Sequence, residues 1–174
     1  LELAPDYAEA HNNLGNLLKD LKRHDEAIQH FEASIRVFPD NPSTHNNLGT
    51  VHAMKGDVNK AAVCFAKAVR LEPTYVDARQ NLGVAYMHQG RLAAAEKELA
   101  KAVKMAQGGM VYEQQRLAAA KASLARANSP EEQNAVRKEI SVAQQAVNAA
   151  TGKYRRGMEF LRSVQARRGE TPTP

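Results

Sequence analysis

The chain has 174 residues and a net charge of +5; 43% of its residues are hydrophobic, 5% are aromatic and none is tryptophan. A core built mainly from Ala, Leu, Val and Ile favours packed helices over a β-sandwich or barrel, because strands draw on β-branched and aromatic residues. The single cysteine, Cys64, excludes a disulfide framework and a multi-cysteine metal site. We find no signal-peptide pattern and no apolar stretch near the ~20 residues that cross a bilayer, which favours a cytoplasmic location.

A short motif repeats along the first two thirds of the chain. HNNLG occurs at 11–15 and 45–49, and an altered copy, RQNLG, occurs at 79–83, each 34 residues after the one before. Self-alignment at this period defines three units, 8–41, 42–75 and 76–109. Pro5 stands one period before Pro39. Residues 1–7 are therefore expected to be the remnant of a preceding repeat, in a chain cut from a longer protein.

Each unit has the pattern of two amphipathic helices, A and B, expected at about 8–21 and 25–38 in the first unit. Pro39 closes helix B, because proline cannot continue a helix. Gly56 and Gly90 stand at A-to-B turns, where a positive φ lets the chain reverse, and Lys22 takes that place in the first unit. A glycine such as Gly15 inside helix A costs about 1 kcal/mol relative to alanine, which indicates close approach of another helix.

These recurring residues resemble the tetratricopeptide repeat family, whose units combine Leu-Gly on helix A, a small residue and an aromatic on helix B, and a closing proline. The first two units match fully and the third keeps the pattern without the proline, having Gln107-Gly108-Gly109 instead. The matching residues are Leu14-Gly15, Ala27, Phe31 and Pro39; Leu48-Gly49, Ala61, Phe65 and Pro73; Leu82-Gly83, Tyr86 and Ala95. His11, His45 and Arg79 replace the family's large first aromatic. The resemblance implies an all-α fold, a right-handed α-α superhelical solenoid.

The remaining residues, 110–174, depart from the repeat and carry the whole excess of positive charge. Residues 1–109 hold 13 basic and 13 acidic side chains, whereas residues 110–174 hold 11 and 6. An Ala-rich helix is expected at 111–127. A second helix is expected from Pro130 to about residue 167, because Ser129 suits an N-cap and Glu131 and Glu132 suit a first helical turn.

An apolar seam with alternating spacings of four and three runs along this second helix. Its members are Val136, Ile140, Ala143, Val147, Ala150, Tyr154, Gly157, Leu161 and Val164. We expect a C-terminal helical hairpin or long helix over 110–168, with a bend at Gly152 or Gly157 as one option, and a flexible tail over 169–174. The hairpin either caps the last repeat or extends from the solenoid as a dimerisation arm.

No arrangement of reactive side chains indicates catalysis. The six histidines lack the i,i+4 pair of a helical zinc site, so a packing role is expected for them. Cys64 lies on a helix B without a nearby base. We find no P-loop, nucleophile elbow or dinucleotide-binding motif. We therefore expect a non-catalytic protein with neither metal nor cofactor.

The polar face of each helix A is the better candidate for function. Side chains three or four apart share a helix face, so Leu14, Gly15 and Leu18 point away from the asparagines of the first unit. Helix A lines the concave surface of tetratricopeptide superhelices, and this resemblance implies a peptide-binding groove. The predicted groove residues are Asn12, Asn13, Asn16, Asn46, Asn47, Thr50, Gln80, Asn81, Val84 and His88, with Met54 and Met87 beside them.

Asn13, Asn47 and Asn81 stand one repeat apart and are expected to form a row along this groove. Packed helices lie ~8–10 Å apart and an extended peptide rises ~3.3 Å per residue, so an asparagine would meet the peptide about every third residue. An amide donates and accepts, and so pairs with any peptide backbone. The row resembles the asparagine ladder of the protein O-linked N-acetylglucosamine transferase repeats. The alternative is that these asparagines are only solvated.

Three functions follow from these patterns. We favour a module that binds an extended peptide or a partner protein in the groove. The alternatives are a scaffolding or homo-oligomerising appendage of a larger enzyme, such as a glycosyltransferase, through the 130–167 helix, and a basic surface for nucleic acid or membrane. That surface would use Lys153, Arg155, Arg156, Arg162, Arg167 and Arg168. The family's carboxylate clamp for chaperone tails is disfavoured, because Asn12, Asn46, Asp77 and Asn81 stand where it needs cations.

Overall fold

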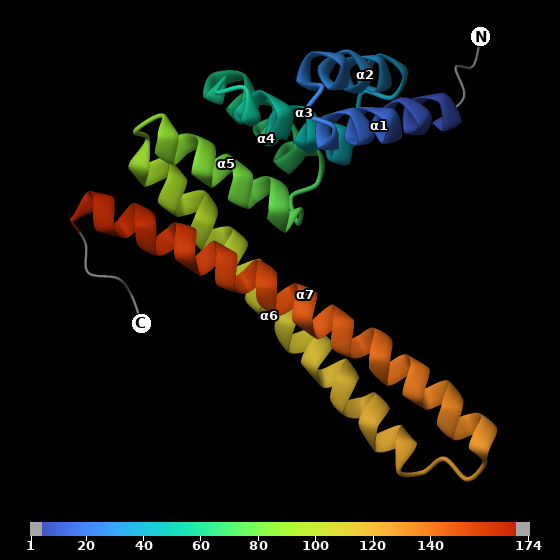
Figure 1. Ribbon diagram of the computed structural model, residues 1–174. Coiled ribbons are helices and arrows are strands. Elements are labelled where there is room, and N and C mark those ends of the chain that lie inside the picture. The colour runs from blue at the N-terminus through green and yellow to red at the C-terminus, as the bar shows by residue number, and fades with distance from the viewer. Residues whose placement is uncertain (1–4, 170–174) are drawn as a thin grey trace.

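The computed structural model describes residues 5–169, which form seven helices (Figure 1). They are α1 (Pro5–Asp20), α2 (His24–Val37), α3 (Pro42–Met54), α4 (Val58–Leu71), α5 (Val76–His88), α6 (Leu92–Leu124) and α7 (Pro130–Arg168). This confirms the all-α solenoid. The predictions for residues 1–4 and 170–174 lie outside the described residues.

The helix ends follow from local sequence. Asn41 caps α3 by accepting a hydrogen bond from the Thr44 N–H at 3.2 Å, and Ser129 and Glu132 form a capping box at the start of α7. Gly56 (φ 81°) and Gly90 (φ 74°) make the predicted A-to-B turns. Lys22 makes the same turn at φ 60°, a left-handed conformation that strains a residue with a Cβ.

A glycine on each helix A allows a large side chain of helix B to reach the backbone. A Cβ built on Gly15 would lie 2.7 Å from the Phe31 ring, and one on Gly83 would lie 2.5 Å from Leu99 Cγ. Gly49 stands in the same relation to Phe65. The close approach predicted from these helix-interior glycines is therefore confirmed.

Stacking of the units buries the apolar faces in three clusters. The first joins Phe31 of α2 to Leu48 and Val51 of α3, and the second joins Phe65 of α4 to Leu82 of α5. The third joins Leu99 of α6 to Leu161 and Val164 of α7. The C-terminal half of α7 thus covers the third unit in the way that α3 and α5 cover the units before them.

Within residues 5–169, no helix packs on the outer side of α1. Leu14 and Leu17 are 40% and 55% exposed, whereas Leu48 and Val51, their equivalents in α3, are buried. Leu14 therefore lacks the cover that Leu48 and Leu82 receive from a neighbouring unit, because α1 begins the described stack.

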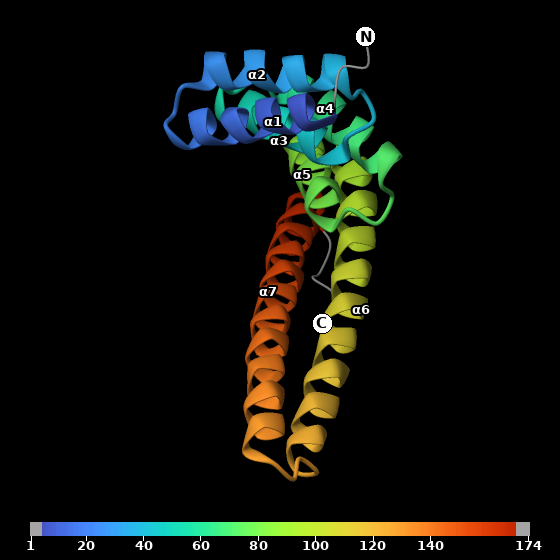
Figure 2. The same ribbon diagram turned by 90° about the vertical axis from the view of Figure 1, so that its right-hand side faces the viewer.

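The two long helices form one antiparallel hairpin whose far end projects from the solenoid (Figures 1 and 2). The helix expected at 111–127 is the last part of α6, which continues from the third unit through Gly108 and Gly109 to Leu124. These glycines keep the N–H groups that a closing proline would lack, which permits the helix to continue. α7 is likewise a single helix through Gly152 and Gly157.

The apolar seam of α7 faces α6. All of its members are buried or half-buried, and Ala143, Leu161 and Val164 are buried in the core. The apolar surface that suggested a homo-oligomer is therefore buried within the hairpin of a single chain.

Replacing Gly83 by alanine tests the close approach of helix A to helix B. We expect the Gly83→Ala variant to be less stable by about 1–2 kcal/mol, because overpacking against Leu99 outweighs the gain in helix propensity. Gly108→Ala is the matched control, since a Cβ there meets nothing within 4 Å; it should be neutral or stabilising. Denaturant unfolding measures both, and equal shifts in the two variants would contradict the account.

The strained turn at Lys22 gives a second test of the fold. Glycine adopts φ 60° without a steric penalty, so Lys22→Gly should raise the free energy of unfolding by about 0.5–1 kcal/mol. Gly56→Ala should lower it, because its φ of 81° is unfavourable for alanine. Thermal melts of the two variants should shift in opposite directions.

Candidate binding groove on the helix-A face

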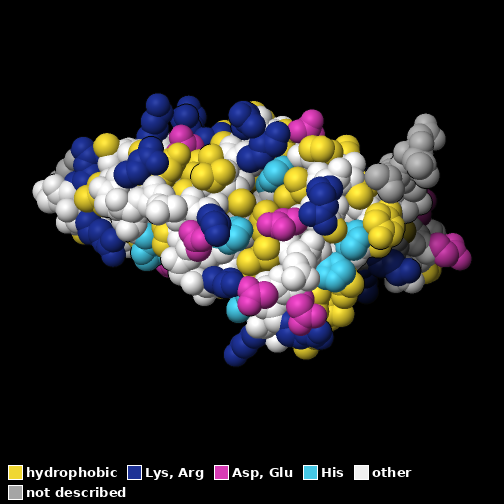
Figure 3. All heavy atoms as spheres, turned by 90° about the horizontal axis from the view of Figure 1, so that it is seen from above, with side chains coloured by type: hydrophobic (Ala, Val, Ile, Leu, Met, Phe, Trp, Pro, Cys, Tyr) yellow, Lys and Arg dark blue, Asp and Glu magenta, His cyan; other side chains and the backbone are white. Residues whose placement is uncertain are grey.

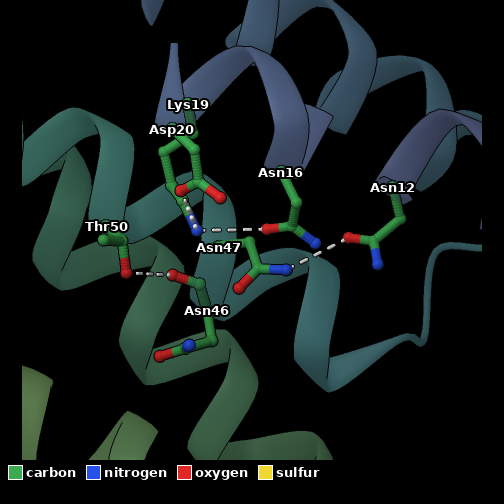
Figure 4. Close-up of polar contacts among 7 residues, drawn as sticks. All are labelled: Asn12, Asn16, Lys19, Asp20, Asn46, Asn47 and Thr50. Carbon is green, nitrogen blue, oxygen red and sulfur yellow. Dashed lines mark hydrogen bonds and ion pairs between the residues drawn. The ribbon is translucent and has the colours of Figure 1, made fainter. Parts of the chain in front are cut away.

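Successive A helices are tied together by pairs of asparagine side chains (Figure 4). Asn47 Nδ2 of α3 donates a hydrogen bond to Asn12 Oδ1 of α1 at 3.2 Å. One unit later, Asn81 Nδ2 of α5 donates to Asn46 Oδ1 of α3 at 3.0 Å. The first asparagine of the HNNLG motif, Asn12 or Asn46, thus faces the following unit. The asparagine next to the leucine, Asn47 or Asn81, faces the preceding unit.

Gln80 continues this pattern into the C-terminal helix. It occupies the position of Asn12 and Asn46 in the repeat, and its Nε2 donates to the main-chain oxygen of Lys153 in α7 at 2.8 Å. Gly157, one turn further along α7, lies against the same amide, since a Cβ there would be 2.7 Å from Gln80 Nε2. Gln80 therefore ties α7 to α5 from the repeat position of Asn46, although Gln80 donates its hydrogen bond and the acceptor is a main-chain oxygen.

The predicted groove residues differ in how far a ligand can reach them. Asn13 and His88 are exposed, and Asn12, Asn16, Asn47, Thr50, Asn81 and Val84 are half-buried. Asn46 is 8% exposed and Gln80 is 2% exposed, because both lie between neighbouring A helices. Met87, expected on this surface, is instead buried in the core cluster that α7 completes, because α7 covers that side of α5.

A hollow of about 710 Å³ opens between α3 and α5 and brings four of the predicted side chains together. We call it the groove. It is lined by the predicted Thr50, Asn81, Val84 and His88, by apolar residues including Met54, Val58 and Phe65, and by Arg156 of α7. The repeat pattern did not indicate a role for Arg156 here, because the 34-residue period ends before α7.

The polar end of the helix-A face lies on α1, away from the groove. Lys19 Nζ donates to Asn16 Oδ1 at 3.2 Å and lies 3.7 Å from Asp20 (Figure 4). At the other end, Lys153 pairs with Asp77 at 2.8 Å. The face of the molecule seen from above in Figure 3 shows basic, acidic and apolar side chains intermingled.

The side chains that replace the family's first aromatic make hydrogen bonds to nearby parts of the fold. The Nδ1 atoms of His11 and His30 lie 2.8 Å apart, so one ring donates to the other. His45 Nε2 contacts the Pro39 oxygen at 2.8 Å, and the equivalent Arg79 donates to the Pro73 oxygen at 2.8 Å and pairs with Glu98.

The described residues offer little for chemistry. Burial raises the pKa of the Cys64 thiol to about 11, which keeps it protonated at neutral pH. Residues 5–169 contain no cluster of three or more His, Cys, Asp or Glu side chains that could hold a metal ion. In the same range, no helix is long and apolar enough to cross a membrane.

Comparison with known families finds two matches, both described as tetratricopeptide repeat, over residues 6–72 and 52–124. No curated protein sequence matches the chain.

Solved structures with a similar fold include three tetratricopeptide proteins or domains. The first such domain of Spaghetti (RPAP3), bound to the HSP90 peptide SRMEEVD, has a TM-score of 0.59 at 19% identity, over 82% of this chain and 97% of that one. MamA has a TM-score of 0.57 at 17% identity, over 94% and 82%. The Sgt2 domain from Aspergillus fumigatus has a TM-score of 0.57 at 17% identity, over 96% and 86%. At these identities the likeness concerns the fold.

Removing one member of an asparagine pair tests the tie between units. Asn81→Ala leaves the nearly buried Asn46 oxygen without its donor, and should lower the free energy of unfolding by about 1–3 kcal/mol. Asn13→Ala, at an exposed position, is the matched control and should change it by less than about 0.5 kcal/mol. A double-mutant cycle of Asn46→Ala and Asn81→Ala should give a coupling of about 0.5–1.5 kcal/mol; additive effects would contradict a direct bond.

The raised pKa of Cys64 predicts a slow thiol reaction. Only the thiolate reacts with iodoacetamide, and with a pKa of about 11 it is a very small fraction at pH 8. The folded protein should react about a hundredfold more slowly than the protein in denaturant, and its rate should keep rising as the pH increases towards 10. A rate that levels off near pH 8.5, the ordinary thiol pKa, would contradict this environment for Cys64.

Proposed function

The chain belongs to the tetratricopeptide repeat family, and from this premise we propose that it is a non-catalytic module that holds an extended peptide of a partner protein against its A helices. The proposed contact residues are Asn12, Asn13, Asn16, Asn47, Thr50, Asn81, Val84 and His88, with Asn46 and Gln80 behind them as supports. The observation that carries the proposal is the groove, which gathers side chains from α3 and α5 that the helix face and the family resemblance had predicted.

The asparagine pairs support the proposal through the atoms that they leave available. The amide of Asn47 or Asn81 has two N–H groups and an oxygen, and only one N–H is needed for the bond to the preceding unit. That bond fixes the orientation of the amide before a ligand arrives, which reduces the entropy lost on binding.

A carboxylate clamp of the chaperone type lacks its cationic side chains in this chain. Spaghetti (RPAP3) was solved with an HSP90 peptide, and the carboxylate clamp expected for such tails needs cations on helix A. At those positions this chain has asparagines and Asp77, and Asp77 is paired with Lys153. We therefore favour recognition of the peptide main chain over a chaperone-type clamp.

The two alternative functions have less support from the contacts of α7. Its apolar seam packs against α6, which leaves little of it for a second chain. Of the basic residues considered for nucleic acid or membrane, Lys153 pairs with Asp77 and Arg168 with Glu96. These ion pairs reduce the positive charge available to a phosphate surface.

Filling the groove should abolish peptide binding without unfolding the protein. We expect Val84→Trp to weaken binding of peptides selected from a randomised display library by at least about tenfold, because the indole would occupy the hollow next to Thr50. Val142→Trp is the matched control, since Val142 is an exposed valine far along α7. Fluorescence anisotropy measures both. If selection yields no binder, or if both variants bind as the unmodified protein does, the proposal is wrong.

A further inference from the structure

We propose that α7 acts as the helix A of a fourth unit and that Arg156 on it selects extended peptides in which an acidic side chain lies beside an apolar one. This inference rests on the proposed function, and it adds the chemical class of the peptide. It also assigns a role to the C-terminal helix, which extends the groove instead of blocking it.

The hydrogen bonds between A helices define the position of Arg156 in the repeat. Asn46 bonds to Asn81 of the next helix A, and Gln80, at the position equivalent to Asn46, bonds to Lys153 of α7. Lys153 therefore takes the position of Asn81. Three residues further along the helix are Val84 in α5 and Arg156 in α7.

The groove confirms this correspondence independently of the hydrogen bonds. Thr50, Val84 and Arg156 share one position in successive A helices, and all three line the same hollow. Side chains at one repeat position thus form a row across α3, α5 and α7, although the 34-residue period ends before α7.

The lining of the groove has two chemically distinct parts. Ala53, Met54, Val58, Phe65 and Val84 provide an apolar wall, which suits a side chain such as leucine because its burial removes apolar surface from water. Arg156 is the one lining residue among residues 5–169 with a permanent charge. No lining residue is acidic.

Arg156 makes no ion pair within residues 5–169, in contrast to some other basic side chains of the molecule. Lys153, one turn earlier, is paired with Asp77, and Lys67 is paired with Asp40. An arginine beside an apolar wall offers a carboxylate two parallel N–H donors, and the bond gains strength where water is partly excluded.

The carboxylate is assigned to an Asp or Glu side chain, not to a peptide C-terminus. The row of A-helix side chains continues on both sides of the groove, from Asn12 and Asn47 on one side to α7 on the other. A side-chain carboxylate reaches Arg156 while the peptide main chain continues along this row. A terminal carboxylate would end the main chain at the groove.

The test uses an array of extended peptides with acetylated and amidated ends, about nine residues long so that they span the repeats at ~3.3 Å per residue. Each has leucine at its centre, a serine background, and Glu, Gln or Lys at each flanking position in turn. We expect the intact chain to bind the best Glu peptide at least about tenfold more tightly than its Lys counterpart. This preference should weaken with added salt.

Charge reversal at Arg156 should reverse that preference. Arg156→Glu should favour Lys over Glu peptides, and Arg156→Met should remove the preference while leucine-dependent binding persists. Arg155→Glu is the matched control, because Arg155 is exposed on the same helix and does not line the groove; it changes the net charge equally and should retain the Glu preference.

The outcomes separate this inference from the proposed function. Suppose that Val84→Trp abolishes peptide binding, as the proposed function requires. The inference alone is then overturned if the intact chain shows no preference for Glu peptides, or if Arg156→Glu leaves that preference unchanged. Equal loss of the preference in Arg155→Glu and Arg156→Glu would also overturn it, since it would show a general charge effect. A last comparison uses a peptide that ends at the position of the Glu and carries a free C-terminal carboxylate there. If this peptide binds more tightly than the amidated Glu peptide, the assignment to a side chain is overturned. An array without any binder would overturn the proposed function itself.

Discussion

None of the three repeat units within residues 5–169 can bury its own apolar face, and the rest of the structure depends on how each face is covered. Within the second unit, Gly49 lets the Phe65 ring lie against the backbone of helix A. Between units, the same ring meets Leu82 and Ala85 of the next helix A. One side chain therefore sets both the spacing within a unit and the contact with its neighbour, which explains why leucine-glycine recurs in all three units.

The repeated part of the fold could be predicted from the sequence, because the residues that end helices or form turns recur with the same period as the residues that pack between helices. Pro39, Gly56 and Gly90 mark ends and turns that are fixed by backbone chemistry, and the structure has them where expected. The third unit lacks the closing proline, and nothing in Gln107-Gly108-Gly109 forces a helix to end or to continue. Packing against α7 extends along α6 beyond that point, with Leu117 and Ala120 buried. That tertiary contact has no counterpart in the periodicity.

The candidate site was predictable to the same extent, for the same reason. Thr50, Asn81, Val84 and His88 follow from helix geometry once helix A is recognised, and they line one groove. Met87 was misplaced because its burial depends on α7, and Arg156 was missed as a groove residue for the same reason. The register of α7 against α5 is set by Gln80 and Gly157. A glutamine bonded to main chain and a glycine in a long helix give no sign in the sequence that they belong together.

The two asparagines of the motif connect stability to the proposed binding. Each amide that faces the preceding unit donates one hydrogen bond there and keeps donor and acceptor capacity for a ligand. A freely rotating amide would lose side-chain entropy when it bound a peptide, whereas here that entropy is lost when the units stack. The same atoms would then raise the stability of the solenoid and lower the cost of recognition. This arrangement makes the asparagine row rigid, and its amides bind a peptide main chain whatever the peptide sequence. Any selectivity therefore has to come from other side chains beside the row. Arg156 and the apolar wall of the groove meet that requirement.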